Sequence, residues 1–144
     1  MSQIRCRQLI ESRLAQWAEL NDIKVGYQKQ TFTPPPIDKT DQYRHIRCFQ
    51  LPARTGTEDL EGTHKVYRGV FAINVITPKG RGPAEAGAIV AQLEDLFPTN
   101  LLLTAADGFE CNIVSPLTES AVIEGDVDDT TPTSFEYEAR TSPS

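Results

Sequence analysis

The residues of this chain that could perform chemistry are two histidines and three cysteines. His45 and His64 could act as general bases, but no Ser, Cys or acidic residue stands near either in a recognised nucleophile pattern. Cys6, Cys48 and Cys111 are odd in number and lie far apart, which fits neither a disulfide framework nor a paired metal site. We interpret the histidines as structural and the cysteines as buried thiols in a reducing cytosol. The sequence therefore predicts no catalytic residue, no cofactor and no metal ion.

An acidic segment from Glu124 to Asp129 carries several oxygen ligands and invites comparison with a calcium loop. An EF-hand needs ligands at alternate positions, a central glycine and a glutamate at position twelve. Here Gly125 precedes the aspartates, and no glutamate follows Asp126 at the required distance. We therefore predict a solvated acidic turn over residues 125–132.

A glycine-rich connector at residues 78–83 contains Lys79 and Arg81 and joins a predicted strand to a predicted helix. It lacks the Gly-Lys-Ser/Thr ending of a Walker loop, and Pro83 and Ala84 do not supply the third glycine of a dinucleotide fingerprint. Two interpretations stay open. The connector could hold an anion at the helix N-terminus, or it could present two positive charges to a neighbouring subunit.

The charge balance bears on the class of partner. Acidic residues outnumber basic ones 20 to 14, for a formal net charge of -6 over 144 residues. This charge disfavours adhesion to nucleic-acid phosphates but does not exclude passage of DNA without binding. The chain has no signal-peptide pattern, and no apolar run approaches the roughly 20 residues of a membrane span. We expect a soluble protein made inside a cell.

Two amphipathic helices and several strands position these residues. Apolar side chains recur at three- and four-residue steps over residues 3–20 and 84–97, and Pro83 and Pro98 bound the second helix. The segment 65–77 is apolar on both faces, which is typical of a central strand with both faces covered. Further strands are predicted at residues 24–28, 44–51, 100–104, 109–115, 118–124 and 133–140.

These elements predict the fold class α+β. We expect a single domain over residues 1–140, with a frayed tail at 141–144. The domain should contain a small, mainly antiparallel, twisted sheet with two amphipathic helices packed on it.

Two polar segments, residues 30–42 and 53–64, are predicted to be loops. Consecutive prolines in the first cannot donate ladder hydrogen bonds, and the second is too long for a tight hairpin. We predict that these loops and the connector carry protein contacts. The candidate interface residues are Pro34, Pro35, Pro36, Arg54, Thr55, Glu58, Asp59, Glu61, Lys79 and Arg81.

Several segments, in order, carry a family resemblance. They are Trp17-Ala18-Glu19-Leu20, Thr31-Phe32-Thr33-Pro34 with Tyr43-Arg44, the run from His64 to Phe71, the run from Val75 to Gly82, and a helix entered through Ala84 and closed by Leu96-Phe97. In this order and spacing the chain resembles the tail terminator-like proteins of long-tailed, lambda-like phages and prophages. The resemblance covers residues 1–100 well and the remainder loosely.

The resemblance implies a non-enzymatic subunit that forms a ring, usually a hexamer, on the completed tail tube. Such a ring halts tube polymerisation and offers the tail side of the head–tail joint. The implied partners are further copies of the chain, the tail tube protein and a head–tail connector or stopper protein. Genome DNA would pass through without specific binding, and no membrane is involved. The expected location is the head-proximal end of the virion tail, after synthesis in the bacterial host cytoplasm.

Two alternatives remain at this stage. One is a head-completion, stopper or minor tail protein of the same assembly. The other, from a different class, is a small ligand-binding or hydrolytic domain that uses His45 or His64.

Overall fold

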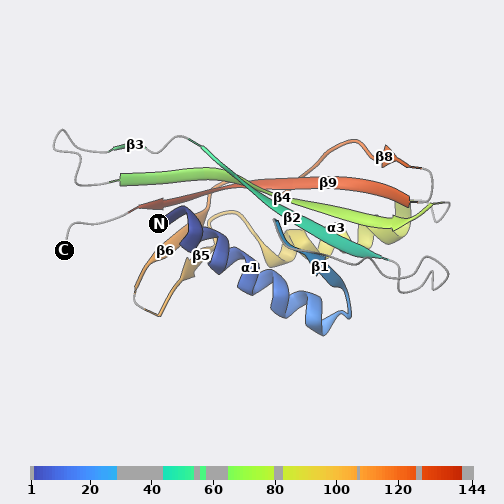
Figure 1. The fold of residues 1–144 in the computed structure, drawn as a ribbon, viewed down its shortest axis with the longest axis horizontal. Coiled ribbons are helices and arrows are strands. Elements are labelled where there is room, and N and C mark those ends of the chain that lie inside the picture. The colour runs from blue at the N-terminus through green and yellow to red at the C-terminus, as the bar shows by residue number, and fades with distance from the viewer. Residues whose placement is uncertain are drawn as a thin grey trace.

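The computed structural model describes residues 2–28, 44–53, 56–57, 65–79, 83–106, 108–125 and 128–140 (Figure 1). Two helices and a set of strands follow one another along the chain. In order they are α1 (Ser2–Leu20), β1 (Lys24–Gly26), β2 (His45–Pro52), β3 (Gly56–Thr57), β4 (Lys65–Pro78), α3 (Pro83–Leu96), β5 (Leu102–Thr104), β6 (Glu110–Ile113), β7 (Thr118–Glu119), β8 (Ile123–Glu124) and β9 (Asp128–Arg140).

Both predicted helices are present, and each buries one stripe of side chains. In α1 the buried stripe consists of Cys6, Ile10, Leu14 and Trp17, and in α3 it consists of Ala86, Ile89, Val90 and Leu93. The first helix ends where Asp22 adopts a left-handed φ of 54°. The Trp17 carbonyl, in the last turn of the helix, accepts from both the backbone N–H of Asn21 at 3.1 Å and its side-chain Nδ2 at 2.8 Å.

The strands form one sheet with the order β1-β2-β4-β9-β6-β5, and the short strands β3, β7 and β8 add to β4 and β9. β4 and β9 are the long central pair, in register from Val66 opposite Arg140 to Pro78 opposite Asp128. This long ribbon spans the molecule in Figure 1. The prediction that residues 65–77 form a central strand is therefore confirmed.

The predicted sheet needs correction from mainly antiparallel to mixed. β1 runs parallel to β2, with Lys24 opposite His45. A parallel pair requires a long crossover, and residues 27–44 are long enough to provide one. The sheet is curled, and the predicted twist is not clear in it.

Three local predictions also change. Residues 128–132, predicted as part of an acidic turn, belong to β9 because they pair with β4 along residues 74–78. The predicted strand at 118–124 is divided into β7 and β8. Within the predicted loop 53–64, Gly56 and Thr57 form β3 beside the start of β4, whereas residues 54–55 and 58–64 lie outside the described part of the chain. The predicted loop 30–42 and the tail 141–144 lie outside it as well.

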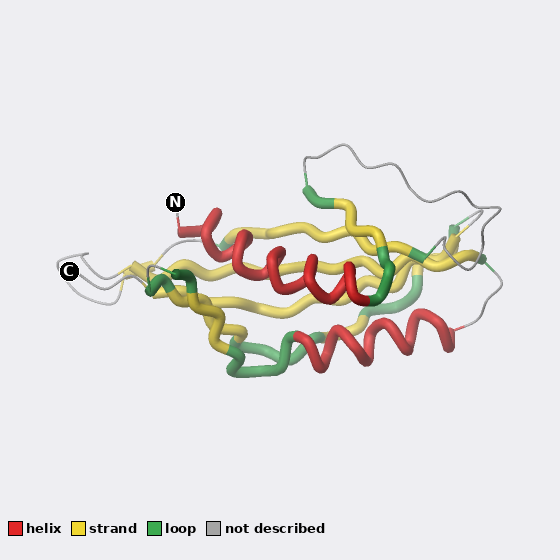
Figure 2. Tube along the Cα trace, turned by 90° about the horizontal axis from the view of Figure 1, so that it is seen from below, coloured by secondary structure: helices red, strands yellow, loops and turns green. Residues whose placement is uncertain are grey.

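Both helices lie on the same side of the sheet (Figure 2). The core fills the space between the helices and the sheet. There the ring of Phe135 of β9 stacks on the ring of Phe97, with centroids 4.9 Å apart, and its centroid lies 5.8 Å from that of Phe71 of β4. On the other side of β4, Val70 and Ala72 are only half-buried. The prediction that both faces of this strand are largely covered was therefore wrong for its middle, because no described helix covers that face.

A buried polar cluster joins the start of α1 to the sheet. The Tyr137 hydroxyl donates to Gln3 Oε1 at 2.5 Å and accepts from Gln50 Nε2 at 2.8 Å. The same Gln50 amide donates to the Gln3 carbonyl at 2.7 Å. Burial raises the pKa of Tyr137 to about 12, so its hydroxyl stays protonated and able to donate.

Candidate functional site

The thiols are placed where chemistry is least favoured. Cys6, Cys48 and Cys111 are buried and free of disulfides. Burial raises the pKa of the Cys48 thiol to about 12, and a hydrogen bond with Cys6, followed by burial, raises the pKa of Cys111. A protonated, enclosed thiol is a poor nucleophile and a poor metal ligand. The hydrogen bond with Cys111 lowers the pKa of Cys6 instead. All three cysteine side chains are fully enclosed in the core, as the sequence indicated.

The remaining candidates for chemistry are dispersed. His45 is buried in β2 at 3% exposure, and His64 lies outside the described residues. No group of three or more His, Cys, Asp or Glu side chains that could hold a metal ion occurs among the described residues. In that same portion, no helix is long and apolar enough to cross a membrane.

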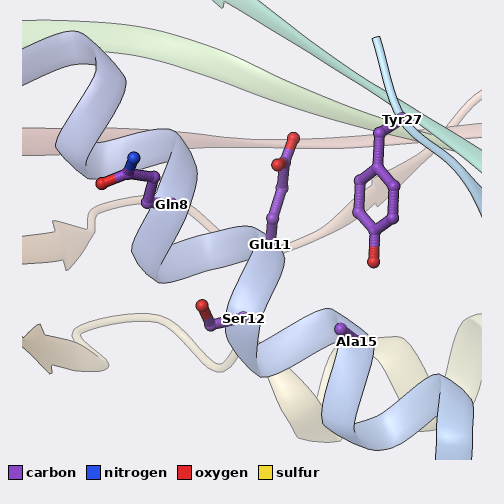
Figure 3. Close-up of a pocket in the computed structure, with 5 residues that line it drawn as sticks. All are labelled: Gln8, Glu11, Ser12, Ala15 and Tyr27. Carbon is purple, nitrogen blue, oxygen red and sulfur yellow. The ribbon is translucent and has the colours of Figure 1, made fainter. Parts of the chain in front are cut away.

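A polar hollow of about 290 Å³ lies between α1 and Tyr27, and is lined by Gln8, Glu11, Ser12, Ala15 and Tyr27. Figure 3 shows the Glu11 carboxylate pointing toward the sheet beside the Tyr27 ring, whereas the Ser12 hydroxyl points away from it. This orientation does not provide the contact between hydroxyl and base that an activated serine needs.

Burial shifts the pKa values of two groups that line this hollow. Burial raises the pKa of the Glu11 carboxyl, and Arg7, whose Nε lies 4.0 Å from Glu11 Oε2, opposes the shift. Burial also raises the pKa of Tyr27, with smaller contributions from Cys48 and Glu11. The hollow therefore contains a protonated phenol and a partly desolvated carboxyl, which suit hydrogen bonding better than nucleophilic catalysis.

A second hollow, of about 320 Å³, opens on the helix-free face of the sheet. We name it the β4–β9 hollow, and its lining consists of Ala53, Arg68, Gly69, Val70, Val114, Glu136, Tyr137 and Glu138. Arg68 Nε of β4 donates to Glu138 Oε2 of the neighbouring strand β9 at 3.3 Å. Val114 is 39% exposed although it is apolar. An apolar, partly charged depression on an open sheet face is the kind of surface that proteins use to bind other proteins.

Of the predicted interface residues, only Lys79 lies in the described part of the chain. Its Nζ donates to the Gly125 carbonyl at 2.8 Å and links the end of β4 to the segment between β8 and β9. Pro34, Pro35, Pro36, Arg54, Thr55, Glu58, Asp59, Glu61 and Arg81 fall outside the described residues. Their role as contacts stays a prediction.

Sequence reasoning missed the β4–β9 hollow. The alternation of Phe135 and Tyr137 with Glu136 and Glu138 indicated a solvent face, but not what lies beside it. Val114 reaches the hollow because its N–H donates to the Glu136 carbonyl at 2.9 Å, a pairing between segments that no local pattern encodes.

The fold defines a class of protein, a small mixed α/β protein whose sheet carries both described helices on one face. The comparisons with known proteins give the family. The chain belongs to the phage tail terminator family, because the model described as "Phage tail terminator protein" matches residues 5–137. This is a structural rather than an enzymatic family, so the chain is a phage tail assembly protein and a component of the virion.

The fold is also found among solved structures. Five of their chains match this one. One is 34% identical, with a TM-score of 0.81, over 100% of this chain and 99% of that chain. No curated protein matches the chain.

Proposed function

We propose that the protein caps the completed tail tube as a ring, stops tube polymerisation and forms the tail side of the head–tail joint. The observation that carries this proposal is the family match over residues 5–137. The open sheet face supports it, since a subunit of a closed ring must offer two different surfaces to its neighbours. We propose six copies in the ring.

The proposed ring has three kinds of partner besides itself. The tail tube protein lies below it, a head–tail connector or stopper protein lies above it, and the genome passes through its centre. The formal net charge of -6 per chain favours passage of DNA without retention. The proposed position is the head-proximal end of the virion tail.

Loss of the protein should produce overlong tails. If the ring is what halts polymerisation, tube subunits continue to add in its absence, and the length distribution should broaden and shift upward. Electron microscopy of particles from a phage that lacks the gene measures tail length directly. Supply of the wild-type chain from a plasmid should restore the normal length.

The same images separate termination from joining. Complete tails of normal, uniform length that are detached from heads would contradict termination. That result would favour a head-completion or stopper role instead.

A further inference from the structure

We infer that neighbouring copies of this chain contact each other head to tail, with Val122 and Ile123 of one copy seated in the β4–β9 hollow of the next. This inference rests on the proposed function, because it names the contact through which the ring would close. It commits to a second copy of the same chain as the occupant of the hollow.

The receiving surface combines apolar and acidic groups. Val70 is half-buried and Val114 is 39% exposed on the helix-free face, and Glu136 is exposed beside them. Glu138 is occupied by Arg68. Within the described ranges, the Glu136 carboxylate forms no ion pair with another side chain. The two valines of the hollow can therefore contact an apolar side chain, and Glu136 can pair with a cation next to it.

The inserting surface has the matching composition. Val122 and Ile123 are 51% and 61% exposed, which is unusual for apolar side chains in or beside a strand. Ile123 pairs with Thr130 of β9, and the alternate residues Thr131 and Thr133 are buried, so Ile123 lies on the helix-free side. We call Val122, Ile123 and Lys79 the β8 knob.

Lys79 belongs to the knob because its Nζ donates to the Gly125 carbonyl, immediately after β8. That bond leaves the ammonium group exposed at the surface with donors to spare. The knob thus presents two apolar side chains and the Lys79 ammonium group, with Asp128 of β9 opposite the neighbouring Pro78. The hollow presents two valines beside the Glu136 carboxylate. This match of apolar side chains and of Lys79 with Glu136 supports a second copy of the chain as the partner.

The positions of the two surfaces determine how copies would associate. The hollow includes Val70 of β4, whereas Ile123 of the knob lies level with Ile76, because both pair with Thr130. The separation along the strand is about 20 Å at roughly 3.3 Å per residue. Figure 1 shows β8 at the opposite end of β9 from β6. Contact of one patch with a different patch on the next copy is heterologous, and repetition of such a contact forms a closed ring when the rotation between copies closes, as the proposed function requires.

Paired cysteines test the contact directly. We expect a chain with both Ile123→Cys and Val114→Cys, assembled on tails and mildly oxidised, to give a ladder of crosslinked oligomers beyond the dimer. Each single variant should remain uncrosslinked, because in this geometry the two residues meet only each other. The native cysteines are buried and should not interfere.

The matched control pairs Leu20→Cys with Val114→Cys. Leu20 is 86% exposed at the end of α1, on the helical side of the sheet, and it should give no ladder. Tails of normal length without a ladder in the test pair would overturn the contact while leaving the capping function intact. A ladder that stops at the dimer would also overturn it, since that result indicates a two-fold pair. Wild-type chain that fails to limit tail length would instead overturn the proposed function.

Charge exchange supplies an independent test. Lys79→Glu or Glu136→Lys alone should weaken oligomer formation roughly fivefold per contact, the size of an exposed ion pair turned into a repulsion. The double variant should recover, and so should a mixture of the two single variants, because alternating copies again place opposite charges at every contact. Failure of both to recover would contradict the pairing of Lys79 with Glu136.

Discussion

A Phe135→Ala variant is expected to lose about 3–5 kcal/mol of unfolding free energy, the usual cost of removing a large aromatic side chain from a core. Phe135 is 1% exposed and contacts two other rings, Phe97 at the end of α3 and Phe71 on β4. Its removal leaves a cavity at the point where the second helix meets the central strands. Because the unfolding free energy of a typical domain is only about 5–15 kcal/mol, the substitution would remove a large part of the stability of the fold.

Urea denaturation of the purified variants measures this loss. The matched control is Phe109→Ala, since Phe109 is only half-buried and lies near the β5–β6 hairpin, where Arg5 lies over its ring at 4.4 Å. The control should lose clearly less stability than Phe135→Ala. Equal losses, or a loss below about 1 kcal/mol for Phe135→Ala, would show that the aromatic cluster is not the centre of the core.

A Gly69→Ala variant is expected to be destabilised, by about 1–3 kcal/mol or more, although alanine normally stabilises a strand relative to glycine. A Cβ atom at position 69 would overlap the Tyr137 hydroxyl and lie 2.6 Å from Cζ of the same ring. Tyr137 cannot move aside freely because it is buried and hydrogen-bonded to Gln3 and Gln50. Glycine is therefore required by the close approach of the ring across the strand pair.

The sign of the effect makes the Gly69 test specific. Gly87→Ala on α3 is the matched control, because a Cβ atom there meets nothing within 4 Å. Alanine in a helix interior should stabilise the protein by about 0.5–1 kcal/mol. Thermal or urea unfolding should thus show opposite shifts for the two variants. Stabilisation by both would contradict the packing of Tyr137 over Gly69.

The helices could be predicted because their pattern is local. The stripe from Cys6 to Trp17 and the prolines at positions 83 and 98 are readable within a few turns of sequence, and the structure confirms both helices. The central strand was equally clear from its run of apolar residues. These elements carry most of the core.

What could not be predicted depends on contacts between distant segments. The parallel pairing of β1 with β2 follows from a crossover, and periodicity does not reveal strand direction. Asp128 and Asp129 have the composition of a turn, but pairing with Pro78 and Thr77 of β4 extends β9 through them. Tertiary pairing overrides local preference in such segments.

The surface was harder to predict than the fold. The place of Lys79 in a charged connector predicts an interface residue, and the structure places Lys79 exposed next to β8. The sequence pattern predicts Val114 and Ile123 as ordinary strand residues, because apolar side chains in predicted strands are expected to be buried. Only the assembled sheet shows that one face carries them, with no covering helix among the described residues.

Imaging of tail tubes polymerised with the purified protein tests the central claim most directly. The claim is that this chain binds the end of a growing tube and prevents further addition. In the presence of the protein, tubes should stop at shorter lengths and carry a ring of density at one end, and the Glu136→Lys variant should do so less efficiently. Tubes that grow to the same lengths as without the protein, with bare ends, would contradict the claim.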